Sequence, residues 1–82
     1  MDNASIRARL CEYLTTDILR DPSYPLGDDE PLISSGLVDS FSLVDIALWV
    51  EQQFGVHLDN SELNADNFDT VAELAAYVEQ RQ

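Results

Sequence analysis

The sequence predicts an all-α fold: a small four-helix bundle of three principal helices and one short helix, with a long first connection. In three separate stretches the apolar residues recur at spacings of three and four, the period of a helix with one buried face. Prolines and glycines gather between the first two stretches. The 82 residues suffice for one modest core, so residues 1–82 are expected to form a single domain.

The first helix is expected from Ala4 to Leu19. Asn3 or Ser5 stands near its N-cap position, and Pro22 is expected to stop it because proline has no amide hydrogen. Its apolar residues lie along one stripe that faces a core: Ile6, Leu10, Tyr13, Leu14 and Ile18.

A long connection is expected from Asp21 to Val38, with one helical turn around Leu32–Ser35. Several apolar residues of this segment are expected to lie on the bundle: Leu26, Leu32, Ile33, Leu37 and Val38. The acidic run Asp28–Glu30 lacks the alternating ligands and central glycine of a calcium-binding loop. It is predicted to be a solvated turn, and no metal site is expected.

The second helix is predicted from Ser40 to Phe54 and carries two apolar stripes. The stripe that must face the core contains Leu43, Ile46, Ala47, Val50 and Phe54. The second stripe, here called the docking patch, contains Phe41, Val44 and Leu48. Because 82 residues offer little material to cover both sides, we expect the docking patch to be partly exposed and to bind partner proteins. Its acidic rim would be Asp39, Asp45 and Glu51; the alternative is that the long connection covers the patch.

The C-terminal third is predicted to hold the short helix and the last principal helix. Gly55 is expected to supply a left-handed C-cap, after which Val56–Leu58 alternates as an extended piece. The short helix falls within residues 59–68, with Leu63 and Phe68 as its anchors. The segment from Thr70 to Glu73 matches a capping box and opens the last helix. The core stripe of that helix contains Val71, Leu74, Ala75 and Val78.

The most informative stretch is Gly36-Leu37-Val38-Asp39-Ser40-Phe41, where the long connection meets the second helix. Asp39 can accept hydrogen bonds from the free amides of the first helical turn, which fixes how Ser40 is presented. Ser40 would stand at the positive end of the helix dipole, a favourable place for a phosphate ester. An Asp-Ser pair is equally an ordinary helix N-terminus signal, so the residues alone leave both interpretations open.

Together with the helix that follows and ends at Phe54-Gly55, this stretch resembles the attachment site of acyl and peptidyl carrier proteins. The resemblance runs from about Leu32 to Val78. It implies that Ser40 carries a 4′-phosphopantetheine arm and that Asp39 helps to place the magnesium used during arm transfer. Phe41 replaces the usual leucine, and one extra residue precedes the Asp-Ser pair. Both departures resemble discrete carriers, such as the D-alanyl carrier protein and free-standing carriers of polyketide or nonribosomal peptide pathways.

The sequence is strongly acidic: it has 16 Asp and Glu residues and four arginines, for a formal net charge of −12. Such a field repels nucleic acid and anionic membranes and attracts basic protein surfaces. There is no apolar run of membrane-spanning length and no signal-peptide segment, so a monomeric cytoplasmic protein is expected. Cys11 is the only cysteine; it cannot form an internal disulfide and is expected to be a packed thiol.

Catalytic motifs are missing from the sequence: it has no nucleophile elbow, no histidine near Ser40 and no zinc spacing, and His57 is isolated. The chain is therefore expected not to be an enzyme. The resemblance implies that a phosphopantetheinyl transferase adds the arm to Ser40. An adenylating ligase, acyltransferase, synthase or tailoring enzyme would then handle an acyl or aminoacyl thioester, in polyketide- or nonribosomal-peptide-type biosynthesis. The alternative is a non-enzymatic acidic helical adaptor for a basic partner, with Ser40 only a helix cap.

Overall fold

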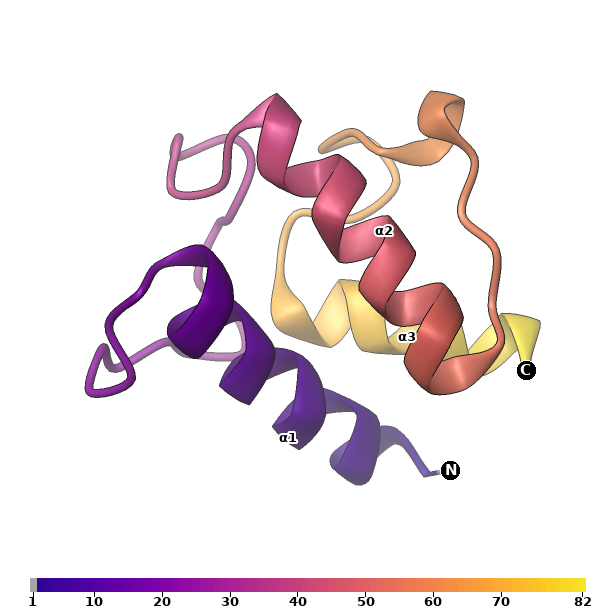
Figure 1. Ribbon diagram of the computed structural model, residues 1–82, viewed down its shortest axis with the longest axis horizontal. Helices are drawn as coiled ribbons and strands as arrows, with labels where there is room; N and C mark the ends of the chain where they lie inside the picture. Colours follow the sequence, from indigo (N-terminus) through magenta and orange to yellow (C-terminus); the bar gives the residue numbers. More distant parts are fainter. Residues whose placement is uncertain (1) are drawn as a thin grey trace.

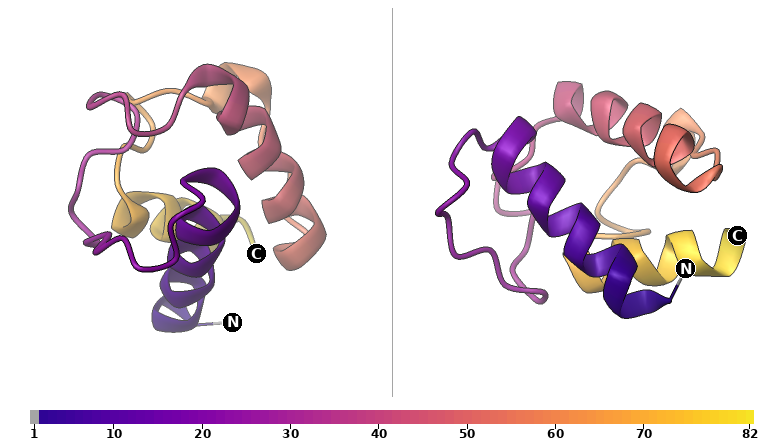
Figure 2. Two further views of the ribbon diagram at one scale, coloured as in Figure 1. Left: turned by 60° about the vertical axis from the view of Figure 1, so that its left-hand side comes forward. Right: turned by 60° about the horizontal axis from the view of Figure 1, so that its bottom comes forward.

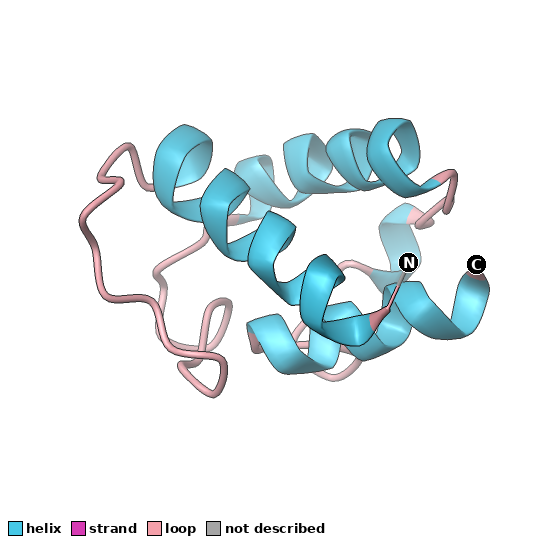
Figure 3. Ribbon diagram, turned by 90° about the horizontal axis from the view of Figure 1, so that it is seen from below, coloured by secondary structure: helices cyan, strands magenta, loops and turns pink. Residues whose placement is uncertain are grey.

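Three helices form the frame of the protein, and the computed structural model describes residues 2–82. In chain order the elements are α1 (Asn3–Tyr13), the π-helical turn η1 (Leu14–Ile18), α2 (Ser40–Phe54), the 3-10 turn η2 (Asn60–Glu62) and α3 (Val71–Arg81), with no strand among residues 2–82. Figure 1 and Figure 3 show the three helices and the long connection at one end of them. The all-α prediction and the long first connection are confirmed.

One hydrophobic core lies between the three helices, and both connections contribute to it. Figure 2 shows the three helices and the connections from two further sides. Each helix buries one stripe at helical spacing, because that arrangement removes apolar surface from water while its polar side stays solvated. The buried apolar residues are Ile6, Leu10, Leu14, Leu32, Val38, Leu43, Ile46, Ala47, Val50, Val56, Leu58, Phe68, Val71, Leu74, Ala75 and Val78.

The first helix differs from its prediction at both ends. Asp2 is the N-cap, and its Oδ1 accepts a hydrogen bond of 2.8 Å from the Ser5 amide, so the expectation of Asn3 or Ser5 is wrong. At the other end the helix widens into η1, where the hydroxyl of Thr15 donates to the Cys11 carbonyl at 2.9 Å. Hydroxyl bonds of this kind bend helices. The helical segment ends at Ile18, and Arg20 has a left-handed φ of 57°.

The second helix has the predicted bounds, and Gly55 closes it with a φ of 69°, as expected for a left-handed cap. Trp49, whose environment the sequence does not decide, is half-buried between α1 and α2. Its ring stacks on Tyr13 with centroids 4.3 Å apart, and the edge contact with Phe54 is 5.6 Å. These aromatic residues pack against the core, and their contacts join α1 to α2.

The short helix within residues 59–68 is reduced to the single turn η2. In the residues after η2, asparagine side chains form hydrogen bonds with backbone groups that would otherwise form helical bonds. The Asn67 amide donates to Oδ1 of Asn64 at 3.1 Å, and Nδ2 of Asn67 donates to the Glu62 carbonyl at 3.0 Å. Such local bonds compete with helix formation. Phe68 anchors the segment as predicted, being 2% exposed, and Leu63 is partly buried.

The N-terminus of α3 departs from the predicted capping box by one residue. The hydroxyl of Thr70 accepts a bond of 3.1 Å from the Glu73 amide, as expected. The carboxylate of Glu73, however, accepts from the amide of Asp69, at 2.9 Å, and not from that of Thr70. The side chain of Glu73 therefore fixes the residue before the cap.

None of the helices formed by residues 2–82 combines the length and apolar character needed to cross a membrane.

Candidate functional site

Ser40 is the first residue of α2 and is exposed. Within residues 2–82 its hydroxyl forms no hydrogen bond. The first turn of a 15-residue helix surrounds it, with amides that have no intrahelical acceptor and the positive end of the helix dipole. The position can therefore take a bulky anionic substituent without loss of an existing contact.

Asp39 is the N-cap of α2. Its backbone is extended (φ −89°, ψ 174°), and its Oδ1 accepts a hydrogen bond of 2.8 Å from the Ser42 amide. Bonds from Ser42, and a weaker one from the Phe41 amide, lower the pKa of Asp39 below its ordinary value of 3.8. The carboxylate is therefore ionised at neutral pH and fixes the start of the helix.

The chain on both sides of the Asp39-Ser40 pair is held by the core. Val38 is 3% exposed, and its amide donates to the Leu32 carbonyl at 2.9 Å. On the other side, Leu43 is buried in the first turn of α2. Gly36 has a φ of 81°, a conformation that glycine adopts without a Cβ penalty and that reverses the chain just before the pair. Ser40 is thus presented from a fixed base.

The docking patch is exposed. Phe41, Val44 and Leu48 are 85%, 46% and 54% exposed, so the long connection does not cover them. Asp39, Asp45 and Glu51 are exposed as well. All six residues are thus on the surface, while the binding of partners by the docking patch and its acidic rim stays a prediction.

A shallow hollow continues the docking patch. The sequence did not lead us to expect this hollow. Its volume is about 120 Å³, and its lining residues are Val44, Ala47, Leu48, Glu51, His57, Leu58 and Asn60. The alternation of apolar and polar residues in Val56–Leu58 is the sequence signal from which this hollow could have been predicted. Because Val56 and Leu58 are buried while His57 points outward, this segment runs along α2 and forms the second wall.

His57 stands at the edge of this hollow between two carboxylates. Its Nε2 is 3.2 Å from Oδ1 of Asp59, and its Nδ1 is 3.4 Å from Oε1 of Glu51. The hydrogen bond with Asp59 raises the pKa of His57 above its ordinary value of 6.5, and the two negative charges add to the effect.

We expect an NMR titration of the His57 ring to give a pKa above 6.5, and Asp59→Asn to lower it more than Glu51→Gln. Since the pKa is raised by folding, the stabilisation is fully present below the unfolded pKa and is lost as the pH rises through the folded pKa. The difference in Tm between the wild-type protein and His57→Gln should be largest at about pH 5.5 and should shrink as the pH rises through the folded pKa, which lies above 6.5. A pKa at or below 6.5 would contradict this arrangement.

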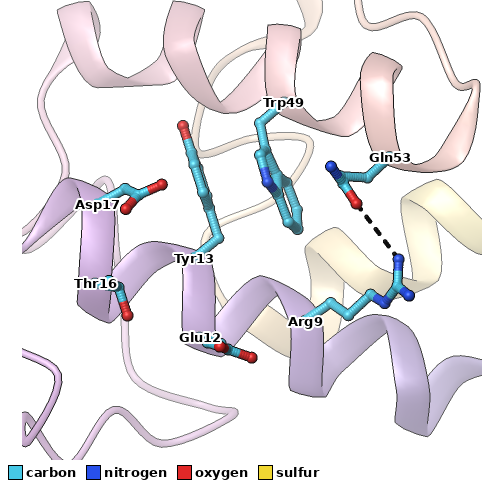
Figure 4. Close-up of a pocket in the computed structure, with 7 residues that line it drawn as sticks. All are labelled: Arg9, Glu12, Tyr13, Thr16, Asp17, Trp49 and Gln53. Carbon is cyan, nitrogen blue, oxygen red and sulfur yellow. Dashed lines mark hydrogen bonds between the residues drawn. The ribbon is translucent and has the colours of Figure 1, made fainter.

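A larger hollow lies elsewhere, between α1 and α2 (Figure 4). Its volume is about 290 Å³, and it is lined by Arg9, Glu12, Tyr13, Thr16, Asp17, Trp49 and Gln53. An Arg9–Gln53 hydrogen bond of 3.4 Å crosses it. None of the site residues expected from the sequence lines this hollow, so it is separate from the surface around Ser40.

Metal-binding and thiol chemistry find little support in the part of the chain that the structure describes. Residues 2–82 contain no group of three or more His, Cys, Asp or Glu side chains that could hold a metal ion. Cys11 is partly buried, and its Sγ lies 3.8 Å from the Leu26 carbonyl oxygen. Burial, with a contribution from the charge of Asp28, raises the pKa of the Cys11 thiol. The thiol is packed and protonated at neutral pH.

Comparison with known proteins agrees with this geometry. A family model described as "Phosphopantetheine attachment site" matches residues 4–78. The D-alanyl carrier protein of Leuconostoc citreum (strain KM20) is 35% identical over 75 residues, covering 92% of this chain and 94% of the relative. That of Leuconostoc mesenteroides is 32% identical over 74 residues, with 90% and 92% covered. That of Lacticaseibacillus casei (strain BL23) is 39% identical over 54 residues, with 66% and 67% covered.

These findings confirm the predicted family, the cofactor and the absence of an enzymatic role. Carrier proteins interact with a phosphopantetheinyl transferase and with biosynthetic enzymes. The chain belongs to the phosphopantetheine attachment family, as a carrier protein that bears covalently attached 4′-phosphopantetheine and catalyses no reaction itself.

Proposed function

We propose that this protein is a discrete carrier that holds an acyl or aminoacyl group as a thioester on an arm attached to Ser40. The observation that carries the proposal is the exposed, unbonded hydroxyl of Ser40 at the N-terminus of α2, within the stretch matched by the family model. A serine that served only as part of a helix start would not require this exposure.

The arm is added in one step, the transfer of a phosphopantetheinyl group from coenzyme A to the serine oxygen. The oxygen of Ser40 forms a bond to the phosphorus that carries pantetheine in coenzyme A, and the bond from that phosphorus to the nucleotide part breaks. The serine proton leaves to a base of the transferase. Asp39 supports this step by fixing the first turn of α2 through its bond from the Ser42 amide. Its exposed carboxylate would help to hold the magnesium that accompanies coenzyme A.

The positive end of α2 favours the resulting phosphodiester. Its negative charge would lie beside free amides of the first helical turn, where anions are stabilised. The protein carries a formal net charge of −12, and the ionised carboxylate of Asp39 lies at this same helix end, so the free amides are the groups there that favour a further anion. The arm is therefore held at its base and free at its thiol, and tethering gives the thioester a high effective concentration at each partner.

The cargo we propose to test first is an aminoacyl group, because the three relatives described above are D-alanyl carrier proteins. An adenylating ligase would then load the thiol, and an acyltransferase, synthase or tailoring enzyme would use the thioester. Polyketide or nonribosomal peptide biosynthesis stays a prediction for the pathway. We place these steps in the cytoplasm, where coenzyme A supplies the arm.

Intact-mass measurement after incubation with coenzyme A and a broad-specificity transferase tests the attachment. The expected result is the gain of one phosphopantetheinyl group, mapped by fragmentation to Ser40. The loaded protein is then offered D-alanine and other amino acids with ATP and an adenylating ligase, and a further gain in mass identifies the cargo. A wild-type protein that gains no arm would support the adaptor alternative instead.

The docking patch gives a separate prediction. Val44→Glu and Leu48→Glu each place a charge on an exposed apolar contact, so the rate of arm transfer or loading should fall by about tenfold, as for a residue worth more than 1 kcal/mol at an interface. Helix content by circular dichroism should stay unchanged, because both side chains face solvent.

The matched control for this prediction is Ala8→Glu. Ala8 is exposed on α1, so the substitution adds the same charge to a helix outside the docking patch. If Ala8→Glu slows transfer as much as Val44→Glu does, net charge and not the docking patch is responsible.

A further inference from the structure

Residue 69, just before α3, binds the turn that leads to Ser40. Three consecutive amides donate to its oxygens: Leu32 to the carbonyl at 2.6 Å, and Ile33 and Ser34 to Oδ1 at 2.7 and 2.9 Å. The hydroxyl of Ser34 donates to Oδ2 at 2.5 Å. One residue thus accepts four hydrogen bonds from a segment about 35 positions away in the sequence, and the two segments lie side by side in Figure 2.

The N-terminus of α3 fixes Asp69 on its own side. The Asp69 amide donates to Oε1 of Glu73 at 2.9 Å, and the Glu73 amide donates to the hydroxyl of Thr70 at 3.1 Å. The neighbouring Phe68 is buried in the core. The Ser34 hydroxyl and amide lower the pKa of Asp69 below its ordinary value of 3.8. The carboxylate is thus charged at neutral pH, and hydrogen bonds to a charged acceptor are the stronger ones.

The turn that Asp69 holds also fixes the residues before Ser40. The Gly36 amide donates to the Ile33 carbonyl at 3.1 Å, and the Val38 amide donates to the Leu32 carbonyl at 2.9 Å. The hydroxyl of Ser35 closes the turn on the Pro31 carbonyl at 2.6 Å. Since Val38 directly precedes the Asp39-Ser40 pair, the contacts form a continuous chain from α3 to the start of α2.

We propose that Asp69 is a positioning residue for arm transfer, which holds the turn from Leu32 to Val38 so that Ser40 meets the transferase in one orientation. This inference rests on the proposed attachment of the arm to Ser40. Nothing in the local pattern around Ser40 indicates it, because Asp69 belongs to a different element of the fold.

The expected consequence follows from the population of the ordered turn. Without the carboxylate, the Ile33 and Ser34 amides have no acceptor in the protein, so the turn is ordered for a smaller fraction of the time. A partner that binds only the ordered form then shows a higher apparent KM by the inverse of that fraction, while kcat of the bound complex changes little.

The test compares Asp69→Ala with Asp69→Asn in arm transfer to the full chain, with coenzyme A and a phosphopantetheinyl transferase. Asp69→Ala should raise the KM for the carrier by about tenfold, as expected for a tenfold smaller competent fraction, with kcat within about twofold. Asp69→Asn keeps an oxygen at Oδ1 for both amides and should restore most of the wild-type KM. Hydrogen exchange at Ile33 and Ser34 should be faster in Asp69→Ala only.

Two control variants separate positioning from general effects. Asp66→Ala removes an exposed carboxylate that bonds to no other residue in the described range 2–82, and should leave KM unchanged. Val78→Ala removes buried apolar volume from the second half of α3, so it lowers Tm without touching the turn.

Each outcome has a distinct meaning. If the wild-type protein accepts the arm and Asp69→Ala behaves like Asp66→Ala, or raises KM no more than Val78→Ala, the positioning role is overturned. If the wild-type protein accepts no arm, the proposed function fails, and the positioning role fails with it. In that case hydrogen exchange at the Ile33 and Ser34 amides still shows whether the contact with Asp69 holds the turn.

Discussion

Ser40→Ala is expected to abolish the uptake of the phosphopantetheinyl group while the fold stays intact. The substitution removes the only oxygen at the exposed first position of α2 that can form the phosphate ester. Asp39 keeps its bond to the Ser42 amide, so the helix start is preserved. The measurement is intact mass after incubation with coenzyme A and a transferase, alongside the far-ultraviolet circular dichroism of both proteins.

Ser42→Ala is the matched control for this result. Ser42 lies two residues further along the same helical turn, and its amide, which Ser42→Ala keeps, donates to Asp39 at 2.8 Å. It should accept one arm, as the wild-type protein does. Equal uptake by Ser40→Ala would move the attachment to another residue and would leave Ser40 as a helix start only.

Phe68→Ala is expected to lower the free energy of unfolding by about 3–5 kcal/mol, the usual cost of truncating a buried phenylalanine. Phe68 is 2% exposed, and its ring meets that of Tyr77 with centroids 5.6 Å apart. It is also the buried residue that fixes the polar segment between η2 and α3 against the core. A domain of 82 residues has limited stability in total, so a loss of this size should be visible as a much lower Tm.

Chemical denaturation of the apo protein measures this loss, with Phe41→Ala as the matched control. Phe41 is 85% exposed, so the same truncation there should change the free energy of unfolding by no more than about 0.5 kcal/mol. The two variants should therefore separate stability from partner binding. A large loss in Phe41→Ala would show that this side chain is covered in solution, against its assignment to the docking patch.

The elements set by local chemistry were predictable from the sequence. The bounds of α2, Ser40–Phe54, follow from Asp39 before it and Gly55 after it, since both act on the immediately neighbouring backbone. The helical period puts Phe41, Val44 and Leu48 on a second apolar stripe. That the long connection leaves this stripe exposed was shown only by the structure. The places where prediction failed are helix ends at which side chains compete for backbone groups, such as Thr15 in η1 and Asn67 after η2.

The sequence by itself determined the three helices and the family, because periodicity, caps and a short motif all act over a few neighbouring positions; that Ser40 is the attachment residue stays its prediction. Only the tertiary structure decided that Asp69 holds the turn before Ser40, that Trp49 stacks on Tyr13, and that the extended piece around His57 walls a hollow beside the docking patch. The first two of these contacts join residues far apart in the chain, and they depend on how the helices are arranged in space, for which no local pattern carries a signal. The hollow has a partial signal in the alternation of Val56–Leu58, but only the packing of this piece beside α2 forms it.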